Sequence, residues 1–145
     1  MILGIGVDIV DKLRIRRLYD LMPDAFVHRI LSEDEIEYFY ASDFSLSKAV
    51  DFIAKRFALK ESVSKSIGCG FGSIISFTDV SISYTKMGDP ILNMNDRILN
   101  AIYEMKKDMF SSFEECALSA KVHVSLSDEK DRTVCFSVLE KFLEK

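Results

Sequence analysis

The longest helical pattern of this chain covers about residues 47–67, and it constrains the fold more than any other feature. The pattern closes at Gly68-Cys69-Gly70, where glycine suits the conformation that commonly ends a helix. At about 100° per residue, one arc of the helix collects the apolar side chains Phe52, Ile53, Phe57, Leu59, Val63 and Ile67. The pattern therefore predicts a long central helix with one apolar face.

Two cations, Arg56 and Lys60, fall inside this apolar arc. Buried cations are costly unless they are paired or reach the edge of the apolar surface. Glu61 and Lys65 lie at the margin of the same arc, and their spacing of four residues makes them neighbours on the helix. Two explanations stay open at this point: a structural ion-pair network, or an anion-binding face that keeps one carboxylate for a metal.

Residues 2–10 alternate in the manner of a β-strand. One face would carry Leu3, Ile5, Val7 and Ile9, and the other would carry Gly4, Gly6 and Asp8. A glycine-lined face that ends in a carboxylate favours close approach by something other than a bulky side chain. Magnesium is commonly bound by one or two carboxylates together with waters and phosphate oxygens. Asp8 and Glu61 are therefore candidate metal ligands, and the alternative is that Asp8 only caps the first helix.

The other patterns describe helices mixed with strands that are linked by hairpins. In chain order we expect a helix over about 12–22 capped by Asp11, a helix from the capping box at Ser32 to Tyr40, a strand over 73–84, a turn over 86–90, a helical segment over 96–120, and strands around 122–126 and 134–138. This mixture predicts a single compact α+β domain over residues 1–145, in which a mostly antiparallel sheet packs against the central helix.

The composition excludes several classes of protein. Apolar residues make up 48% and charged residues 29%, a mixture typical of globular proteins. The net charge of −4 argues against general nucleic-acid binding, and no apolar run approaches the ~18 residues that cross a membrane. The start of the chain has no basic leader, which predicts a cytoplasmic location. Three scattered cysteines without a CxxC pattern predict reduced, buried thiols and no zinc site.

One local exception to the acidic balance is a cluster of four cations, Lys12, Arg14, Arg16 and Arg17, with no acid among them. Such a cluster favours an anionic partner, although a solvated helix face would produce the same pattern.

Several of these segments, in the same order along the chain, resemble the signatures of the holo-acyl-carrier-protein synthase family, the small phosphopantetheinyl transferases. The resemblance is carried by Gly4–Val10 with Arg14-Ile15, by Arg29–Ser32 with Glu35, by Arg56–Lys65 with Gly68–Gly70, by Phe77–Asp79, by Gly88–Pro90 and by Val122–Ser127. These matches span most of the chain.

The resemblance implies the transferase fold and transfer of 4′-phosphopantetheine from coenzyme A to a serine of apo-acyl carrier protein. The other product would be 3′,5′-adenosine bisphosphate, and the reaction would support fatty acid biosynthesis. The family is typically a homotrimer with its active sites at subunit interfaces. Such an assembly is a further explanation for cations that look misplaced on the helix of one chain.

The resemblance also implies roles for particular residues. Asp8 and Glu61 would ligate Mg²⁺, with Glu61 and Lys65 catalytic and Lys65 on a phosphate. Arg56 and the turn residues Gly88 and Pro90 would bind the nucleotide end of coenzyme A, and Arg14 and Arg17 would contact the carrier protein. For the general base we favour Glu61 acting through a water, with Glu35 or Glu37 as the alternatives.

Three features depart from the family pattern. Asp128 stands where the family usually has histidine, with Lys130 as a cation that could compensate, and Asp89 stands where lysine is usual. The segment 93–120 is longer than compact members of the family need, and its pattern predicts an extra helical segment. The two exchanged cations support an alternative function, a non-catalytic relative that binds coenzyme A, a nucleotide or a carrier protein. The intact Asp8, Glu61 and Lys65 argue for the enzyme.

Overall fold

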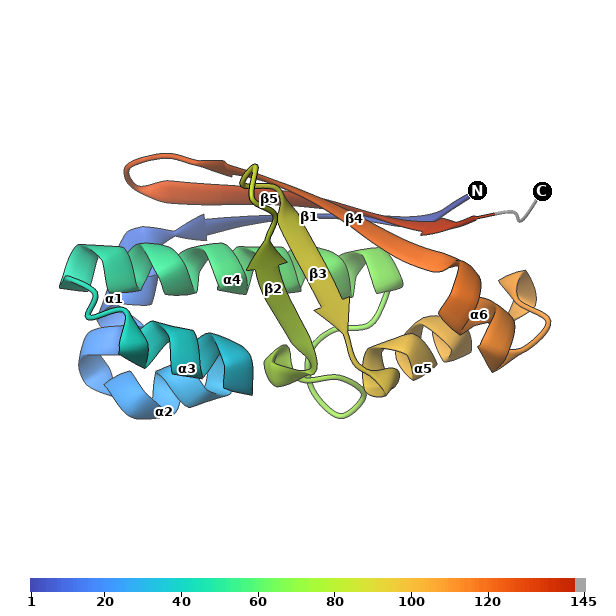
Figure 1. The fold of residues 1–145 in the computed structure, drawn as a ribbon, viewed down its shortest axis with the longest axis horizontal. Coiled ribbons are helices and arrows are strands. Elements are labelled where there is room, and N and C mark those ends of the chain that lie inside the picture. Colours follow the sequence, from blue (N-terminus) through green and yellow to red (C-terminus); the bar gives the residue numbers. More distant parts are fainter. Residues whose placement is uncertain (143–145) are drawn as a thin grey trace.

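A three-stranded antiparallel sheet lies along the long helix α4 (Leu46–Ile67), as Figure 1 shows. The strands are β1 (Ile2–Asp11), β4 (Ala120–Asp128) and β5 (Arg132–Lys141), and their order in the sheet is β1-β5-β4. The computed structural model describes residues 1–142. The expected C-terminal hairpin is confirmed as β4 and β5, and the expected α+β architecture with antiparallel strands is confirmed as well.

The glycine face of β1 packs directly on the backbone of α4. A Cβ atom at Gly4 would collide with the carbonyl oxygen of Ser66, and one at Gly6 would collide with that of Ser62. Ser137 of β5 strengthens this contact, because its hydroxyl donates to the Ser62 carbonyl at 2.7 Å. The close approach predicted for this face is therefore made by the central helix.

The opposite face of the sheet is apolar and open. Ile5, Val7 and Ile9 are 63%, 56% and 59% exposed, and Phe136 of the neighbouring strand β5 is 45% exposed. Leu3 departs from the predicted face and packs against the core, because the register of β1 shifts between Ile2 and Gly4. The alternation in the sequence thus marks an apolar face that the single chain leaves uncovered.

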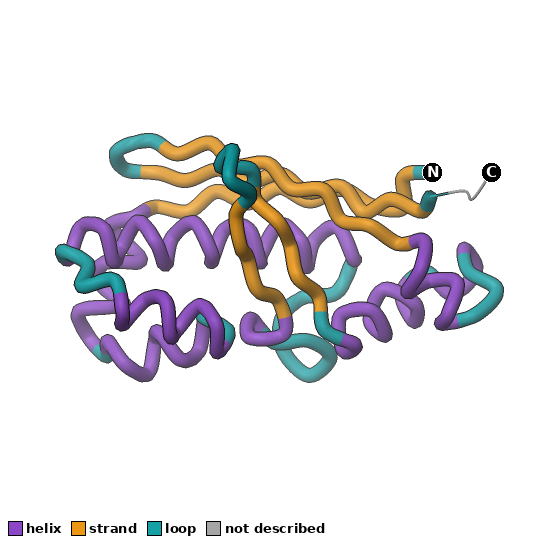
Figure 2. The backbone as a smooth tube through the Cα atoms, viewed as in Figure 1, coloured by secondary structure: helices purple, strands orange, loops and turns teal. Residues whose placement is uncertain are grey.

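Three short helices cover the first half of α4 (Figure 2). α1 (Lys12–Leu21) begins at Asp11, whose carboxylate accepts from the N–H groups of Leu13 and Arg14. Pro23 ends this helix as expected, yet it also starts α2 (Pro23–Ile30), which the sequence patterns did not reveal. α3 (Glu33–Ala41) follows at the predicted position.

The strand expected over 73–84 is wrong in its first half. Only β2 (Val80–Tyr84) is a strand, and it pairs with β3 (Pro90–Met94) in a separate two-stranded sheet. Before it, the Asp79 carboxylate accepts from the Ser76 N–H at 2.7 Å and closes the 3₁₀ turn η1 (Phe77–Asp79). This local bond competes with strand geometry and the β-branched composition does not overcome it.

The single helical segment expected over 96–120 is broken into α5 (Asp96–Met105), the short turn η2 (Lys107–Met109) and α6 (Phe113–Ser119). Ser112 caps α6 by accepting from the Glu115 N–H, so a new helix starts there. Buried residues of α5 pack against the second half of α4, while α1 to α3 pack against the first half. No described helix is long and apolar enough to span a membrane. All three cysteines are free and buried, as predicted.

Candidate active site

Asp8 and Lys65 meet between the edge strand β1 and the helix α4. The Lys65 ammonium donates to Asp8 Oδ1 at 2.8 Å and to the backbone carbonyl of Val7 at 2.9 Å. The second carboxylate oxygen, Asp8 Oδ2, is buried and has no hydrogen-bond partner among the described residues. A buried carboxylate oxygen without a partner is costly, so this atom is open to a cation or a donor from outside the chain.

Glu61 lies one helical turn before Lys65 and is half-buried. Burial raises the pKa of Glu61, and the negative charge of Asp8 raises it further, while the cations Lys65 and Arg14 act in the opposite direction. Asp8, Lys65 and Arg14 therefore each lie within electrostatic range of Glu61. The structure brings two residues of the N-terminal segment, Asp8 and Arg14, close to two residues of α4 that lie about fifty positions later in the chain.

The two carboxylates suit a divalent cation. Two acids that repel each other, one with an orphaned oxygen, would both be relieved by a hard, oxygen-binding ion. The part of the chain that the structure describes contains no group of three or more His, Cys, Asp or Glu side chains that could hold a metal alone. Such a group is not required for magnesium, which keeps several waters and takes phosphate oxygens of a substrate. The donor set present fits that ion.

The two cations inside the apolar arc of α4 are explained by Glu35 of α3. Glu35 is 3% exposed, and its carboxylate lies 2.5 Å from Lys60 Nζ and 3.4 Å from Arg56 Nε. It also accepts from the backbone N–H groups of Ser32 and Ile82 at 3.0 Å each. The structural ion-pair network is therefore the correct explanation for Lys60. The capping box pointed to Glu35 as a helix-start residue only and gave no sign of these partners.

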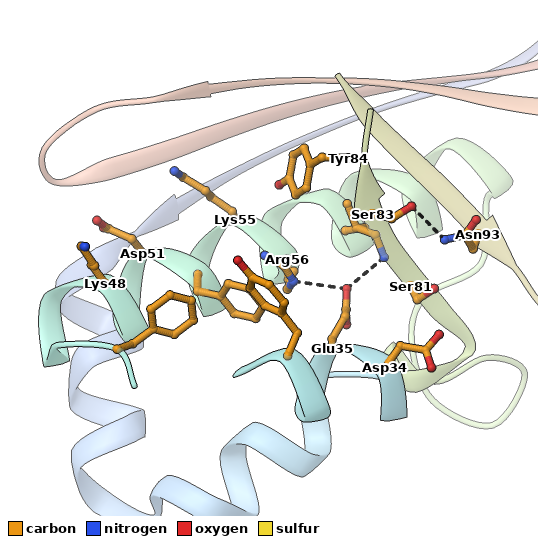
Figure 3. Close-up of a pocket in the computed structure, with 14 residues that line it drawn as sticks. Asp34, Glu35, Lys48, Asp51, Lys55, Arg56, Ser81, Ser83, Tyr84 and Asn93 are labelled. Atoms are coloured by element: carbon orange, nitrogen blue, oxygen red, sulfur yellow. Dashed lines mark hydrogen bonds and ion pairs between the residues drawn. The ribbon is translucent and has the colours of Figure 1, made fainter. Parts of the chain in front are cut away.

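Arg56 forms one wall of a cavity of about 640 Å³ that opens between α3, α4, β2 and β3 (Figure 3). Its guanidinium carbon lies 3.3 Å from the centroid of the Phe52 ring, and within residues 1–142 its Nε has no hydrogen-bond partner. Burial lowers the pKa of Arg56, and the charge of Glu35 opposes this effect. Besides Arg56, the cavity is lined by aromatic, cationic, acidic and polar side chains, among them Tyr38, Phe52, Tyr84, Lys48, Lys55, Asp34, Glu35, Asp51 and Asn93.

Gly88 and Pro90 lie in the turn that joins β2 to β3. Gly88 has a φ of +93° and no atom within 4 Å of the position that a Cβ would take. Thr85 closes the turn, since its hydroxyl accepts from the N–H groups of Met87 and Asp89. Neither turn residue lines the cavity beside Arg56, and neither do Asp8, Glu61 or Lys65. One chain thus presents the proposed metal end and the proposed nucleotide end of the site at separate places.

Asp128, the acid at the end of β4, is already neutralised by lysines. Its carboxylate lies 2.8 Å from Lys12 Nζ and 2.9 Å from Lys55 Nζ and accepts from the Thr133 hydroxyl at 2.7 Å. Burial raises the pKa of Asp128, but these hydrogen bonds outweigh it and hold the pKa below its ordinary value. Lys12 also pairs with Asp51 at 2.9 Å. The exchange at position 128 therefore belongs to a structural network.

The same network divides the basic cluster of α1. Lys12 is buried and doubly paired, and Arg16 pairs with Asp20 at 2.6 Å. Arg14 and Arg17 are exposed and form no ion pair with another residue of the described range 1–142. The two arginines to which the family resemblance gives a carrier-protein contact are thus the members of the cluster without an ion-pair partner in the described range.

A family model described as the 4′-phosphopantetheinyl transferase superfamily matches residues 4–121. The holo-[acyl-carrier-protein] synthase of Vesicomyosocius okutanii subsp. Calyptogena okutanii is 36% identical over 140 residues, which cover 97% of this chain and 98% of that protein. The synthase of Vibrio cholerae serotype O1 is 30% identical over 141 residues, which cover 97% of this chain and 99% of that protein. Because coverage is nearly complete on both sides, the chain has about the same length as these proteins.

Solved structures give the same result. The holo-[acyl-carrier-protein] synthase of Neisseria meningitidis is 33% identical with a TM-score of 0.79, and the match covers 97% of this chain and 100% of that one. The synthase of Bacillus anthracis, solved in complex with CoA (3′,5′-ADP), is 32% identical with a TM-score of 0.73 and coverage of 98% and 99%. The chain belongs to the 4′-phosphopantetheinyl transferase superfamily and, within it, to the holo-acyl-carrier-protein synthases.

Proposed function

We propose that this chain transfers the 4′-phosphopantetheine group of coenzyme A to a serine of apo-acyl carrier protein, releasing 3′,5′-adenosine bisphosphate in support of fatty acid biosynthesis. The observation that carries the proposal is the contact of Lys65 with Asp8, whose buried second oxygen has no partner among the described residues, close enough to Glu61 for the charges to act on it. The relatives bear the name of this activity, and the B. anthracis relative was solved with coenzyme A.

The proposed metal is Mg²⁺, held by Asp8 and Glu61. When bound, it would neutralise charge on the pyrophosphate of coenzyme A. Lys65, at the same place, would bind a phosphate oxygen and stabilise the charge that develops on the leaving group. Glu61 is the proposed base, acting through a water, because the alternative Glu35 is 3% exposed and already engaged by four donors or cations.

The cavity beside Arg56 is the proposed place for the nucleotide end of coenzyme A. A buried guanidinium between aromatic rings suits a planar base carrying phosphates, because Arg pairs with phosphate and stacks on rings. Lys48 lines the same cavity as a further cation, whereas Lys55 is paired with Asp128. The turn with Gly88 and Pro90 would close over the nucleotide, and the open space around Gly88 leaves its backbone accessible.

We propose a homotrimer in which neighbouring chains complete each site. The apolar outer face of the sheet supports this assembly, because contiguous exposed apolar surface marks an interaction site. The separation of the acid pair from the cavity in one chain also supports it. For the partner surface on α1, the exposed Arg14 and Arg17 suit an acidic carrier protein. The proposed compartment is the cytoplasm, with which three free, buried thiols are consistent.

The test is a mass measurement of the carrier. Purified chain is incubated with apo-acyl carrier protein, coenzyme A and Mg²⁺, and the carrier is expected to gain one phosphopantetheine group. Asp8→Ala and Glu61→Ala should each abolish turnover while the circular dichroism spectrum stays unchanged. A carrier that never gains mass, under conditions in which a known synthase succeeds, would support the alternative of a non-catalytic coenzyme A or carrier-protein binder. Against that alternative, the negative charge of Asp128 is balanced by Lys12 and Lys55.

A further inference from the structure

Lys65 contacts the same carboxylate that is proposed to bind the metal ion. Its ammonium lies 2.8 Å from Asp8 Oδ1, while the other oxygen, Asp8 Oδ2, has no partner among the described residues. The Lys65 side chain is half exposed, at 50%, so its long aliphatic stem is free to take another course. The proposed metal ligand Asp8 is therefore paired with a flexible, half-exposed side chain.

The charges of the site balance without a metal. Asp8 and Glu61 contribute two negative charges, and Lys65 and Arg14 are the two cations that act on Glu61. With a divalent cation between the two carboxylates, the positive charges of the site would exceed the negative ones. The metal ion would then repel both side-chain cations, because like charges repel across short distances. Lys65 is the one that contacts Asp8 directly, so it is the cation that must yield.

We infer that Lys65 has two successive positions: in the free enzyme its ammonium neutralises Asp8 in place of the metal, and on metal loading it leaves Asp8 and becomes available to a phosphate of coenzyme A. This inference rests on the proposed function and deepens it. Lys65 is then a competitor of the metal before it is a ligand of the substrate. Metal binding and the arrival of the phosphate-binding cation are coupled through one side chain.

The first measurement is the affinity of the enzyme for Mn²⁺ in the absence of coenzyme A. Binding is monitored by the decrease of the electron paramagnetic resonance signal of free Mn²⁺. Lys65→Gln removes the competing ammonium, so the variant is expected to bind Mn²⁺ at least about threefold more tightly than wild type, a factor typical of an exposed ion pair. Turnover of the same variant should fall, because the phosphate loses its cation. A variant that binds metal better and works worse separates this role from a simple phosphate contact.

The control is Lys107→Gln, which removes the same charge from a lysine that pairs with Glu104 on the surface of the chain. It should change neither Mn²⁺ affinity nor turnover. Asp8→Asn reports on the proposed metal site itself and should weaken Mn²⁺ binding strongly. If Asp8→Asn has no effect, the metal site is wrong; if Asp8→Asn weakens binding but Lys65→Gln binds like wild type or more weakly, only the competition is wrong.

A second measurement follows the release of Lys65 directly. Brief treatment with acetic anhydride, followed by peptide mass spectrometry, gives the rate at which each lysine is modified. Adding Mg²⁺ to the wild-type enzyme should raise the rate at Lys65 severalfold and leave Lys107 unchanged. The Mg²⁺ concentration should be high enough to displace all bound Mn²⁺ in a competition measurement. An unchanged modification rate at Lys65 under that condition would overturn the release step.

Discussion

Glu35 shows how much a single buried side chain can organise in this molecule. Its carboxylate joins α3 to Lys60 and Arg56 of α4 and to the backbone of β2 at Ile82. Burial lowers the pKa of Lys60 to about 8, while the charge of Glu35 opposes that shift. A buried pair of this kind is weak as a source of stability but costly to break, since one charge would remain unpaired. The arrangement holds the Arg56 wall of the cavity in place.

Gly6 is the residue at which the smallest change should have the largest structural effect. Gly6→Ala would drive a methyl group into the Ser62 carbonyl oxygen of α4, so it should lower the free energy of unfolding by about 1 to 3 kcal/mol. Gly72→Ala is the matched control, because nothing lies within 4 Å of a Cβ there, and it should stay within about 0.5 kcal/mol. Urea denaturation measures both; equal effects of the two variants would contradict the packing described here.

Asp128 should make stability depend on pH. Its pKa is lowered in the folded chain, so the stabilisation is present above the unfolded value of 3.8 and is lost as the pH falls through the folded value. Asp128→Asn should therefore destabilise the protein by about 1 to 3 kcal/mol at neutral pH. The difference from wild type should stay constant down to about pH 5 and narrow below about pH 4 in urea titrations. A difference that persists at low pH would show that charge is not its source.

At the scale of elements, α1 carries both a cation that anchors it to the rest of the chain and cations that are exposed to a partner. Its buried Lys12 ties it to Asp51 and Asp128, whereas its exposed Arg14 and Arg17 face outward. The same short helix is therefore anchored by one cation and offers others to a partner. Its start at Asp11 continues directly from β1, so the proposed carrier surface and the proposed metal ligand are carried by one continuous stretch of chain.

Charge reversal at Arg14 tests this division. Arg14→Glu should raise the KM for the carrier protein about tenfold or more, because charges at an interface rim govern encounter with a charged partner. The KM for coenzyme A should rise much less. The effect should shrink as ionic strength increases. Lys107→Glu makes the same change outside α1 and should leave the ratio of the two KM values unaltered. Equal increases in both values for Arg14→Glu would remove α1 from the carrier surface.

Elements were predictable wherever periodicity and caps agreed. The helix α4, the hairpin of β4 and β5, and the starts of α1 and α3 lie close to their predicted bounds. The sequence could not reveal α2, because its eight residues are too short for a periodic pattern and follow a proline that signals an end. The strand predicted for residues 73–79 is wrong, because the Asp79 side chain accepts from the Ser76 N–H and this local bond competes with the strand. Such contacts depend on local geometry that composition does not encode.

The sequence proposes members of a site but does not indicate its geometry. The glycine face of β1 and the charged residues of α4 lie on two segments that the structure places in contact. Pairing of Asp8 with Lys65 across 57 positions depends on the packing of strand on helix, which no spacing in the sequence expresses. The sequence leaves two explanations for Lys60, an ion-pair network and an anion-binding site. The 2.5 Å contact of Lys60 with Glu35, a residue of another helix, shows that the network is correct.

At the scale of the whole molecule, the open apolar face of the sheet predicts association. Phe136→Asp places a charge in the middle strand of that face, and the variant should be monomeric by light scattering after gel filtration and should lose transferase activity. Leu118→Asp is the control, because Leu118 is 76% exposed on α6, away from this face, and its mass should match that of wild type. A Phe136→Asp variant with unchanged mass would exclude this face as the interface.

The bare contact between β1 and α4 has a consequence for how this enzyme can diversify. At Gly4 and Gly6 the strand approaches the helix so closely that a Cβ atom would collide with a helix carbonyl, and the Ser137 hydroxyl bonds the helix at the same place. A side chain at either glycine would push β1 away from α4, and with it Asp8, the proposed metal ligand. As the sequence diverges, these two glycines are therefore the positions at which the proposed site tolerates exchange least.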